Sequence, residues 1–550
     1  MSTNLSHLLG RKGHEKNLFE QLGDAATQTG TPDVATLEKL RQDFLVGKST
    51  VYGTVSFYDF LKPENKGKKV YVCNGSSCMT AGTQDEVHKK LHKHYAANEI
   101  GEMCCLGRCH ENSSFHVDGK NFSGSDIDQI EKIKEGNITT AEKYKVGSKG
   151  AAILTSDYGS VADYYKLFTA TLKRPVSELL SELKDSGLRG RGGAGFSMAF
   201  KLESCKNAES DSKFIVCNAD EGDPGAYSDR YIMENRPHAL LMGMMMAGYI
   251  VGADCGVVYI RGEYPESVDI INDCVNQLRN DKLLGNNIQG SGFNFDFKVI
   301  KAQGAYICGE ETALLSSIEG QRPEVRIRPP YPTQQGLFNK PTAVNNVETL
   351  ANLPFIFKNG GKAFAAIGTA KSSGTKLISL DGYFKNPGIY EVDMGTPLSV
   401  VIEELGGGFR KPVKAMHIGG PLGGLVPIAK IKDLSVDFDS FAKEGFLLGH
   451  ASVVCIPEEY PLIKYIEHLF RFTAHESCGK CFPCRLGSTR GYEMVEKAQK
   501  EDYKMDMTLM KDLLDTMEAG SLCALGGGLP LPIKNTLKYF ENELAPYFKK

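Results

Sequence analysis

Two groups of closely spaced cysteines constrain this chain more than any other feature of its sequence. With 550 residues, the chain is long enough for roughly three to four domains with their own cores, so a small disulfide-stabilised scaffold is excluded. The amino terminus has no long apolar stretch followed by small residues, so we expect no secretory signal and a cytoplasmic protein. In a reducing compartment, clustered thiols are more often ligands than disulfides. We expect the isolated cysteines to be core or incidental residues: Cys205, Cys217, Cys255, Cys274, Cys308 and Cys455.

The carboxyl-terminal group has the spacing C-x2-C-x2-C, formed by Cys478, Cys481 and Cys484, and Cys523 follows 39 positions after the last of them. Three cysteines in one tight loop can bind three corners of a 4Fe-4S cube, and a remote fourth completes it. A zinc site is the alternative, although zinc sites more often use two separated C-x2-C pairs. The spacing therefore favours a 4Fe-4S cluster.

The amino-terminal group consists of a C-x4-C pair, Cys73 and Cys78, and a C-x3-C pair, Cys105 and Cys109. Two pairs of thiolates suit a 2Fe-2S cluster, in which each pair binds one iron. Zinc is again the alternative, because wide spacings also occur in zinc ribbons. Cys104 is adjacent to Cys105 and is expected not to bind the same metal.

Charge identifies no partner for this chain. There are 64 Lys plus Arg residues and 67 Asp plus Glu residues, so the net charge of -3 gives no reason to expect nucleic acid or an anionic membrane. The apolar stretch at 239–260 could resemble a membrane span, but Gly252, Ala253 and Asp254 interrupt it. We expect a buried helix, a turn and a buried strand there, and no direct membrane insertion.

Hydrophobic patterning divides the chain into four predicted domains of an α/β multidomain protein. Residues 1–145 combine a helical segment with a small α/β unit, and residues 146–370 alternate short apolar strands with helical or glycine-rich segments. Residues 371–455 are predicted to form a small β-rich domain, and residues 456–550 a helical domain. Asp118-Gly119 follows an apolar run and predicts a hairpin in the first domain.

A glycine-rich loop in the second predicted domain contains the pattern G-x-G-x-x-G at Gly190, Gly192 and Gly195. This pattern alone is a weak signal, because no clear strand precedes it and arginines are embedded in it. Exposed backbone amides, together with Arg189 and Arg191, would nevertheless suit phosphate, and a solvated glycine loop is the alternative.

Three further loops strengthen the nucleotide interpretation. An acidic loop at 218–225 directly follows an apolar strand, and similar polar loops occur at 304–312 and 345–349. Carboxylates and amides at the carboxyl edge of a sheet are placed to bind ribose hydroxyls or the edge of a flavin ring. Each loop could simply cap a helix, but together, beside two iron-sulfur signatures, they predict a redox nucleotide site.

These motifs resemble the flavin-bearing, NADH-oxidising F subunit of respiratory complex I and its relatives in NAD-linked hydrogenases and formate dehydrogenases. The resemblance covers roughly residues 150–550 and is carried, in order, by GRGGAGF, NADEGDPGAYSDR, GAYICGEETA, NNVET and SCGKCFPCR. The amino-terminal part, with VYGTVSFY at 51–58 and its cysteine pairs, resembles the E subunit of complex I. The resemblance implies a thioredoxin-like 2Fe-2S domain, a Rossmann-like FMN and NADH domain, a small β-grasp-like domain and a carboxyl-terminal helical 4Fe-4S bundle.

The same resemblance implies FMN and NAD(H) as cofactors, with hydride transfer performed by FMN and with Glu221 positioning the nicotinamide. The residues implied for FMN are Gly190, Arg191, Gly192, Lys201, Asn218, Asp220, Asn345, Asn346 and Thr349. Those implied for NAD(H) are Phe196, Lys201, Glu221, Tyr306, Glu310 and Glu311. Gly193 and Gly309 are implied as cofactor-binding residues without assignment to one of the two. Ser197 and Leu202 stand where the family often has Pro and Trp, which implies a differently shaped nicotinamide pocket.

The expected function is that of a diaphorase subunit that passes electrons between NAD(H), FMN and iron-sulfur clusters in a multisubunit complex. EGDPGAY, GSTRG at 487–491 and SLCALGG at 521–527 look most like the beta subunit of soluble NAD-dependent formate dehydrogenases. The alternatives are the NADH-binding subunit of complex I or of an NAD-linked hydrogenase, bifurcating or not, a zinc-stabilised scaffold, and a self-sufficient NADH:ferredoxin reductase. The chain contains no further four-cysteine ferredoxin runs, so we expect electrons to be exchanged with other iron-sulfur subunits.

Overall fold

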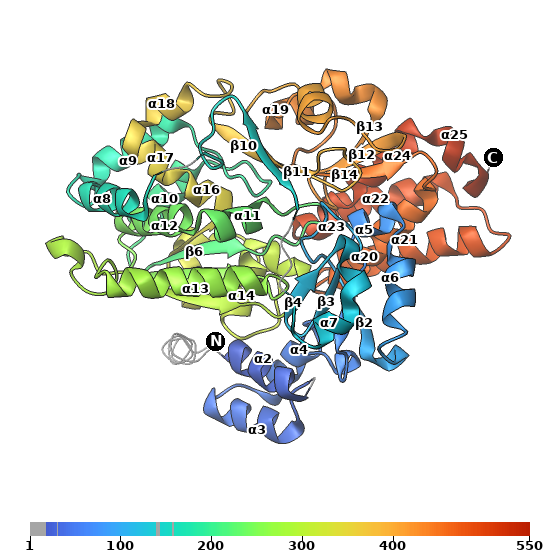
Figure 1. The fold of residues 1–550 in the computed structure, drawn as a ribbon, viewed down its shortest axis with the longest axis horizontal. Coiled ribbons are helices and arrows are strands. Elements are labelled where there is room, and N and C mark those ends of the chain that lie inside the picture. Colours follow the sequence, from blue (N-terminus) through green and yellow to red (C-terminus); the bar gives the residue numbers. More distant parts are fainter. Residues whose placement is uncertain (1–17, 30, 139–142, 157–158, 550) are drawn as a thin grey trace.

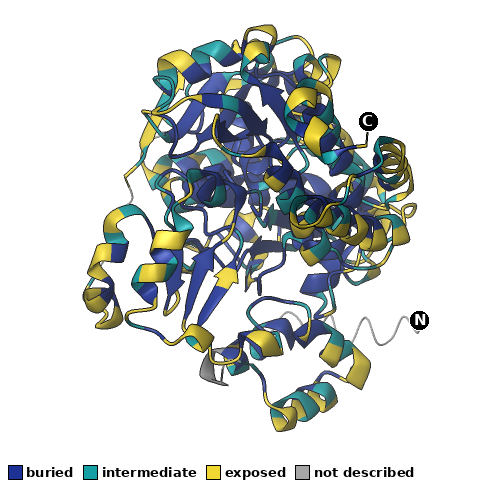
Figure 2. Cartoon of the chain, turned by 90° about the vertical axis from the view of Figure 1, so that its right-hand side faces the viewer, coloured by how far each residue is buried: buried dark blue, intermediate teal, exposed yellow. Residues whose placement is uncertain are grey.

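The computed structural model describes residues 18–29, 31–138, 143–156 and 159–549, and its strands form three sheets with helices packed around them (Figure 1). The part of the predicted amino-terminal helical segment at 1–17 lies outside the described residues. Burial is concentrated in the sheets and on the inner faces of the helices, whereas exposed residues gather on the outer helices (Figure 2).

A four-stranded parallel sheet forms the centre of the second predicted domain. Its strands, in spatial order, are β8 (Asp296–Lys301), β7 (Cys255–Ile260), β6 (Phe214–Ala219) and β9 (Thr342–Asn346). The chain moves outward from β6 to β7 and β8, and then returns to the other side of β6 with β9. The connections therefore diverge between β6 and β9, and the crevice at the carboxyl ends of such strands is the usual ligand site of an open α/β sheet.

Alternate residues of β6 face two different cores. Ile215 and Cys217 pack with helices α12 (Pro237–Val251) and α13 (Pro265–Asn280). Phe214 and Val216 face the other core. That second core contains residues of the helices α2 (Leu18–Thr29), α3 (Val34–Asp43), α4 (Lys48–Val55) and α14 (Glu311–Ile318). The amino-terminal helices therefore complete the core of the nucleotide-binding region.

The apolar stretch at 239–260 forms the buried helix, turn and strand predicted from its sequence. Helix α12 ends at Gly252, whose φ of 76° lies in the left-handed region that favours glycine, and β7 begins at Cys255. No described helix is both long and apolar enough to cross a membrane.

The amino-terminal cysteines lie in and beside a second, four-stranded sheet, with Cys73 at the end of one strand and the others in the helix or loop that follows a strand. Its strands, in spatial order, are β2 (Ile100–Met103), β1 (Val70–Cys73), β3 (Phe115–Val117) and β4 (Lys120–Phe122). The predicted hairpin joins β3 to β4, and both of its turn residues have positive φ, 48° at Asp118 and 76° at Gly119. Helices α5 (Ser76–Ala81), α6 (Gln84–Leu91) and α7 (Ile130–Lys134) accompany this sheet.

The third sheet is mixed and has six strands. In spatial order they are β13 (Gly424–Pro427), β12 (Val413–Ile418), β14 (Ser452–Pro457), β10 (Thr375–Leu380), β11 (Gly388–Asp393) and β5 (Lys145–Lys149). Strand β5 pairs in parallel with β11, so the segment after the amino-terminal domain contributes an edge strand to a sheet formed mainly by residues 375–457.

The carboxyl-terminal region is helical, as predicted. Its helices are α20 (Leu462–Glu476), α21 (Phe482–Lys500), α22 (Met507–Gly520), α23 (Ala524–Gly528), α24 (Pro530–Tyr539) and α25 (Glu541–Leu544). The remaining α-helices of the described residues are α8 (Val161–Thr171), α9 (Val176–Ser186), α10 (Met198–Asn207), α11 (Ser228–Asn235), α15 (Pro332–Gln335), α16 (Val347–Ala351), α17 (Leu353–Asn359), α18 (Gly361–Ala365) and α19 (Phe438–Lys443). The loops between α20, α21 and α23 carry the carboxyl-terminal cysteines.

Candidate flavin, nucleotide and iron-sulfur sites

A cavity of about 1100 Å³ opens where the connections of the parallel sheet diverge. Asn218 at the end of β6 and Asn345 at the end of β9 both line it. Eleven residues predicted from the sequence contribute to its walls: Gly190, Gly192, Phe196, Lys201, Asn218, Gly309, Glu310, Glu311, Asn345, Asn346 and Thr349. The structure thus brings together loops that are separated by up to 159 residues between Gly190 and Thr349.

The glycine-rich loop lies close against the turn between β9 and α16. The backbone N–H of Arg191 donates to the hydroxyl of Thr349 at 2.8 Å, and the loop closes on itself through a bond from Gly190 N–H to the carbonyl of Phe196. A Cβ atom at Gly192 would lie 3.0 Å from the side chain of Asn346. Glycine is therefore needed at this position for the loop to approach the turn.

The cavity wall also contains a buried amide without a protein partner. Among the described residues, Nδ2 of Asn345 has no hydrogen-bond acceptor, although the residue is only 7% exposed. A buried donor of this kind is costly unless a ligand or water accepts from it. The orphaned amide and the glycine-lined wall fit FMN, whose ring and phosphate offer several acceptors.

Charged side chains line another part of the cavity. Lys201 Nζ lies 3.1 Å from Glu311 and donates to the carbonyl of Val344 at 2.9 Å. Arg328 Nη1 lies 3.0 Å from Glu311, and Glu310 caps α14 by accepting from two of its first amides. This network offers both donors and carboxylate acceptors, as a pyridine nucleotide with phosphates and ribose hydroxyls requires.

Five predicted cofactor-binding residues do not line this cavity: Arg191, Gly193, Asp220, Glu221 and Tyr306. The guanidinium of Arg191 turns away and donates to the carbonyl of Ser373 at 2.6 Å, and burial lowers the pKa of Arg191 to about 10. The motif places their loops correctly but does not determine which side chains face inward.

Each of the acidic and aromatic members of this group has a partner or a buried position behind the wall. The Glu221 carboxylate accepts from the first turn of α11, and the Tyr306 hydroxyl donates to Asp223 at 2.7 Å. Asp220 is half-buried, and desolvation raises the pKa of its carboxyl well above the usual range. These side chains therefore support the loops of the site.

Several cavity residues were not found from the sequence. Arg328, Tyr331, Thr333 and Gln334 line the cavity from the segment that includes α15. The prolines in the run from Arg328 to Pro332 could have marked a rigid loop, but they indicate no ligand chemistry. Cys523, which was predicted as a metal ligand, also lines the cavity.

The carboxyl-terminal cysteines gather beside this cavity. Cys478 and Cys484 are buried, while Cys481 and Cys523 are partly exposed at the amino ends of α21 and α23. Burial, followed by the charge of Glu310 and then by the thiols of Cys484 and Cys478, raises the pKa of Cys523 to about 12. Cys478 and Cys484 belong to one buried cluster against which Cys481 and Cys523 pack, and a Cβ atom at Gly526, three residues after Cys523, would lie 2.6 Å from Cβ of Cys484. Their arrangement fits one 4Fe-4S cluster.

The amino-terminal cysteines form a fully buried group. The Sγ atoms of Cys105 and Cys109 are 3.3 Å apart, and Cys73 contacts both Cys78 and Cys105. These contacts join all four predicted ligands and fit a 2Fe-2S cluster. The acidic loop reaches this group, because the backbone N–H of Gly225 donates to Cys109 Sγ at 3.2 Å.

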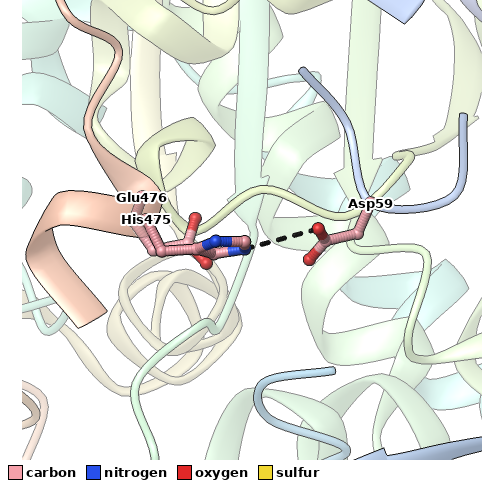
Figure 3. Close-up of side chains that lie close together, drawn as sticks. All are labelled: Asp59, His475 and Glu476. Carbon is pink, nitrogen blue, oxygen red and sulfur yellow. Dashed lines mark ion pairs between the residues drawn. The ribbon is translucent and has the colours of Figure 1, made fainter. Parts of the chain in front are cut away.

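A polar contact joins the amino-terminal segment to the helix that precedes the carboxyl-terminal cysteines. Figure 3 shows His475 of α20 pointing toward Asp59, and His475 Nε2 lies 3.5 Å from Asp59 Oδ1. Asp59 also pairs with Lys62, while the neighbouring Glu476 accepts from the backbone N–H of Tyr306 at 2.9 Å. The contact therefore fixes the loop of Tyr306 between the amino-terminal segment and the carboxyl-terminal domain.

Three family models match the chain in the order expected from its motifs. A thioredoxin-like [2Fe-2S] ferredoxin matches residues 8–137, the Nuo51 FMN-binding domain matches residues 183–355, and the NADH-ubiquinone oxidoreductase-F iron-sulfur binding region matches residues 464–547. They cover both cysteine groups and most of the cavity-lining loops.

Curated relatives and solved structures agree with these matches. The chain is 40% identical to the NADP-reducing hydrogenase subunit HndC of Solidesulfovibrio fructosivorans, over 74% of this chain and 84% of that protein. It is 38% identical to an F-type NADH-quinone oxidoreductase subunit of Rhizobium meliloti, over 72% and 95% of the two chains. It is 32% identical to the NAD-reducing hydrogenase HoxS subunit alpha of Cupriavidus necator, over 98% and 93%. A chain in the crystal structure of an air-oxidised NAD+-reducing [NiFe]-hydrogenase superposes with a TM-score of 0.85 at 27% identity, covering 98% of this chain and 94% of that one.

Proposed function

Because the chain belongs to the family of flavin- and iron-sulfur-dependent NAD(H) oxidoreductase subunits found in complex I and NAD-reducing hydrogenases, we propose that it is the diaphorase subunit of a larger electron-transfer complex. The family binds FMN, one 4Fe-4S cluster and one 2Fe-2S cluster in these domains, which decides against zinc at the two cysteine groups. One observation carries the proposal: the cavity suited to FMN and NAD(H) has Cys523, a predicted cluster ligand, in its own wall.

The glycine-rich loop and the asparagines at the ends of β6 and β9 would hold FMN. Asn345 would donate its orphaned amide to the flavin, and the close approach of Gly192 to Asn346 leaves room for the ligand beside the backbone. Bound FMN supplies the chemistry that no side chain here provides, since it exchanges hydride with NAD(H) and single electrons with iron-sulfur clusters.

The charged network of the cavity would hold NAD(H). Phe196 is 51% exposed and offers a ring face for stacking, while Lys201 and Arg328 offer positive charge to the phosphates. The carboxylates of Glu310 and Glu311 would accept from ribose hydroxyls. Glu221 would contribute by fixing the acidic loop, because its carboxylate is bound to the amides of α11.

The partner of this subunit would dock beside the carboxyl-terminal cluster. Phe482 is 70% exposed and Leu486 is 54% exposed, and both follow the cluster ligands directly on α21. Leu522, next to Cys523, is also exposed. Large exposed apolar side chains that gather around a redox centre indicate a surface for another protein. We assign this surface to an iron-sulfur subunit that exchanges electrons with the complex.

For the identity of the complex, we propose a cytoplasmic NAD-dependent formate dehydrogenase. The motifs at 221–227, 487–491 and 521–527 support this assignment. None of the fifteen cysteines, all of which lie in the described part of the chain, forms a disulfide, which fits a reducing compartment. An NAD-reducing hydrogenase is the second candidate, because the hydrogenase relative from Cupriavidus necator aligns with nearly the whole chain.

Metal analysis of the native complex separates these candidates. Mass spectrometry of the anaerobically purified complex, with iron, molybdenum, tungsten and nickel quantified on the same sample, identifies both the subunits and the terminal metal. Molybdenum or tungsten is expected for a formate dehydrogenase. Nickel would assign a hydrogenase, and neither metal would point to complex I or to another iron-sulfur partner.

The role of the cavity is tested by replacing its orphaned amide. In Asn345→Leu, we expect loss of most bound FMN and of NADH-dependent dye reduction, because the flavin loses a buried donor and meets a branched apolar side chain. Asn352→Leu is the matched control, since Asn352 is buried nearby but does not line the cavity. Full flavin content in Asn345→Leu, measured by absorbance after release, would contradict the proposed flavin site.

A further inference from the structure

His450 is a buried histidine whose two ring nitrogens face two different carboxylates. It lies in the turn before β14, is 6% exposed, and comes from the third sheet rather than from the nucleotide-binding region. Its Nε2 lies 3.1 Å from Oδ2 of Asp229, and its Nδ1 lies 3.8 Å from Oε1 of Glu221. A neutral imidazole could donate to only one of them, whereas an imidazolium carries a proton on both nitrogens.

Asp229, the carboxylate that faces Nε2 of His450, contacts the cavity wall. Nδ2 of Asn346 donates to the same Oδ2 of Asp229 at 2.6 Å, and Asn346 lines the cavity. The backbone of the glycine-rich loop lies directly beside His450, because a Cβ at Gly193 would lie 3.6 Å from the backbone of Gly449. The histidine therefore lies behind the part of the wall assigned to FMN.

Glu221, the carboxylate that faces Nδ1 of His450, attaches the acidic loop to α11. Its carboxylate accepts from the backbone N–H groups of Asp229 at 2.9 Å and Arg230 at 3.1 Å. Asn218, three residues earlier, lines the cavity. An ionised carboxylate is the stronger acceptor for these amides, so the charge of Glu221 determines how firmly the loop is attached to α11.

Two buried carboxylates and one imidazole form a close electrostatic group. Burial and the charge of Asp229 raise the pKa of Glu221, and His450 opposes this rise. Burial disfavours the imidazolium, but Asp229 and Glu221 outweigh it and raise the pKa of His450 to about 9. Tyr264 and Arg261 also face the Glu221 side of this group, since the Tyr264 hydroxyl donates to Glu221 Oε2 at 3.3 Å and Arg261 Nη1 donates to the backbone carbonyl of Glu221 at 2.6 Å.

Lys376 on β10 is a further cation that acts on His450, and it is paired with the buried carboxylate of Glu348. Asp223 in the acidic loop is a further carboxyl group that responds to His450 and to Arg261. Neither replaces the charge of the imidazolium between Glu221 and Asp229.

We propose that His450 is a positioning residue for NAD(H) oxidation, which keeps Glu221 and Asp229 ionised together and so fixes the acidic loop and Asn346 in the cavity wall. This inference rests on the proposed function of the cavity. It adds a residue from the third sheet to a site whose sequence motifs lie in the parallel-sheet region. It also predicts a pH dependence that a purely structural histidine would not produce.

Replacing His450 by Gln should shift the acid limb of the NADH reaction. Without the imidazolium, the negative charge of Asp229 causes Glu221 to bind a proton at higher pH. Protonation of Glu221 weakens the attachment of the acidic loop to α11. We expect the acid-limb midpoint of kcat/KM, measured with an artificial dye, to rise by about one pH unit, with up to about a tenfold loss near the acid end. The alkaline limb of the wild type near pH 9, set by loss of the His450 proton, should disappear.

Two further variants separate charge from packing. Asp229→Asn leaves the imidazolium facing only Glu221, so its acid limb should move to lower pH. The double variant Asp229→Asn/His450→Gln removes one charge of each sign, and its acid limb should return toward that of the wild type. If His450→Gln does not fold, the comparison between Asp229→Asn and the double variant decides the question, because loss of His450 should move the limb upward there too.

His417→Gln is the matched control for removal of a buried histidine from the same sheet. His417 on β12 is bonded to Tyr465 and Gly423, and burial lowers its pKa to about 4, so it carries no charge across the assayed range. Its loss should change stability without moving the pH limbs. Equilibrium binding of NAD+, followed by the flavin absorbance from about pH 5.5 to about pH 9.5, provides a readout independent of turnover and should show the same shifts.

The outcomes distinguish this inference from the proposed function. If the wild-type holoprotein lacks FMN or does not oxidise NADH, the proposed function is wrong. The positioning role of His450 is overturned if the wild type does both, but the pH profiles of turnover and of NAD+ binding in His450→Gln are not shifted. It is also overturned if His450→Gln only loses activity equally at every pH, as His417→Gln would. Opposite shifts in the two single variants, with recovery in the double variant, would support it.

Discussion

The two cysteine groups differ in how completely this chain encloses them. Cys73, Cys78, Cys105 and Cys109 are all buried, and a loop of the nucleotide-binding region donates to one of their sulfurs. In the carboxyl-terminal group, two of four ligands are partly exposed, and large apolar side chains around them are open to solvent. The first group is therefore enclosed by this chain, whereas the second lies at the surface that we propose for another protein.

Because the two cysteine groups differ in burial, we expect the two clusters to differ in how well they survive in air. This is the largest effect that we expect. Oxidants and chelators reach an exposed cluster more readily than a buried one. Brief exposure of the reconstituted protein to air should therefore remove most of the 4Fe-4S signal while the 2Fe-2S signal remains, as followed by EPR after anaerobic reduction. Parallel loss of both signals would show that burial does not protect the amino-terminal cluster.

Ligand substitutions should sharpen the same contrast through stability. In Cys105→Ser, the buried cluster loses a ligand at a junction between domains, so we expect the thermal midpoint of the anaerobic holoprotein to fall by several degrees more than in Cys523→Ser. Circular dichroism measures the midpoints, and iron content verifies the loss of each cluster. A larger fall in Cys523→Ser would contradict the internal role of the amino-terminal group.

A polar substitution on the exposed surface should affect only transfer to the partner. Phe482→Ser removes an apolar side chain beside the cluster, and we expect a several-fold lower rate of electron transfer within the native complex with unchanged NADH-dependent dye reduction. Val34→Ser is the control, because Val34 is 83% exposed on the distant helix α3. Equal effects of both variants on the rate of electron transfer would show that the surface around Phe482 is not part of the interface.

The smallest expected effect is on reduction potentials. Arg261 is buried, donates to the carbonyl of Cys104 at 3.2 Å and carries a charge that acts on Cys105, while Lys480 beside the other group is exposed. Arg261→Gln should lower the 2Fe-2S potential by tens of millivolts, and Lys480→Gln should move the 4Fe-4S potential less, because water screens it.

The double variant Arg261→Gln/Glu263→Gln controls for the buried partner carboxylate, with which Arg261 pairs at 3.0 Å. Removing both charges should leave the 2Fe-2S potential nearer to that of the wild type. EPR-monitored redox titration measures all of these potentials, and a larger shift for Lys480→Gln than for Arg261→Gln would contradict the account of burial.

Local sequence patterns were sufficient for the features that depend on spacing or on backbone conformation. The cysteine spacings grouped thiols that lie together in the structure, such as Cys105 and Cys109, and Asp118-Gly119 predicted a hairpin at two positions that adopt positive φ. Gly252 likewise marked the end of a buried helix that could have been mistaken for a membrane span. In each case a few neighbouring residues determine the outcome.

Side-chain direction and long-range packing could not be predicted from local sequence patterns. Arg191 belongs to the glycine motif, but the distant carbonyl of Ser373 draws its guanidinium away from the cavity. Arg328 lines the cavity although its segment carries no recognised motif, and His450 reaches Asp229 from a sheet remote in sequence. The amino-terminal helices cover the second face of the parallel sheet, which no local pattern indicated. These features depend on tertiary contacts.

The central claim, that electrons are exchanged with the partner through the exposed cluster and not through the buried one, is tested most directly by Cys523→Ser in the native complex. After anaerobic addition of NADH, EPR of this variant should still show the reduced 2Fe-2S cluster, while electron transfer to the partner falls to background. Transfer to the partner at the wild-type rate without the 4Fe-4S cluster would contradict the claim.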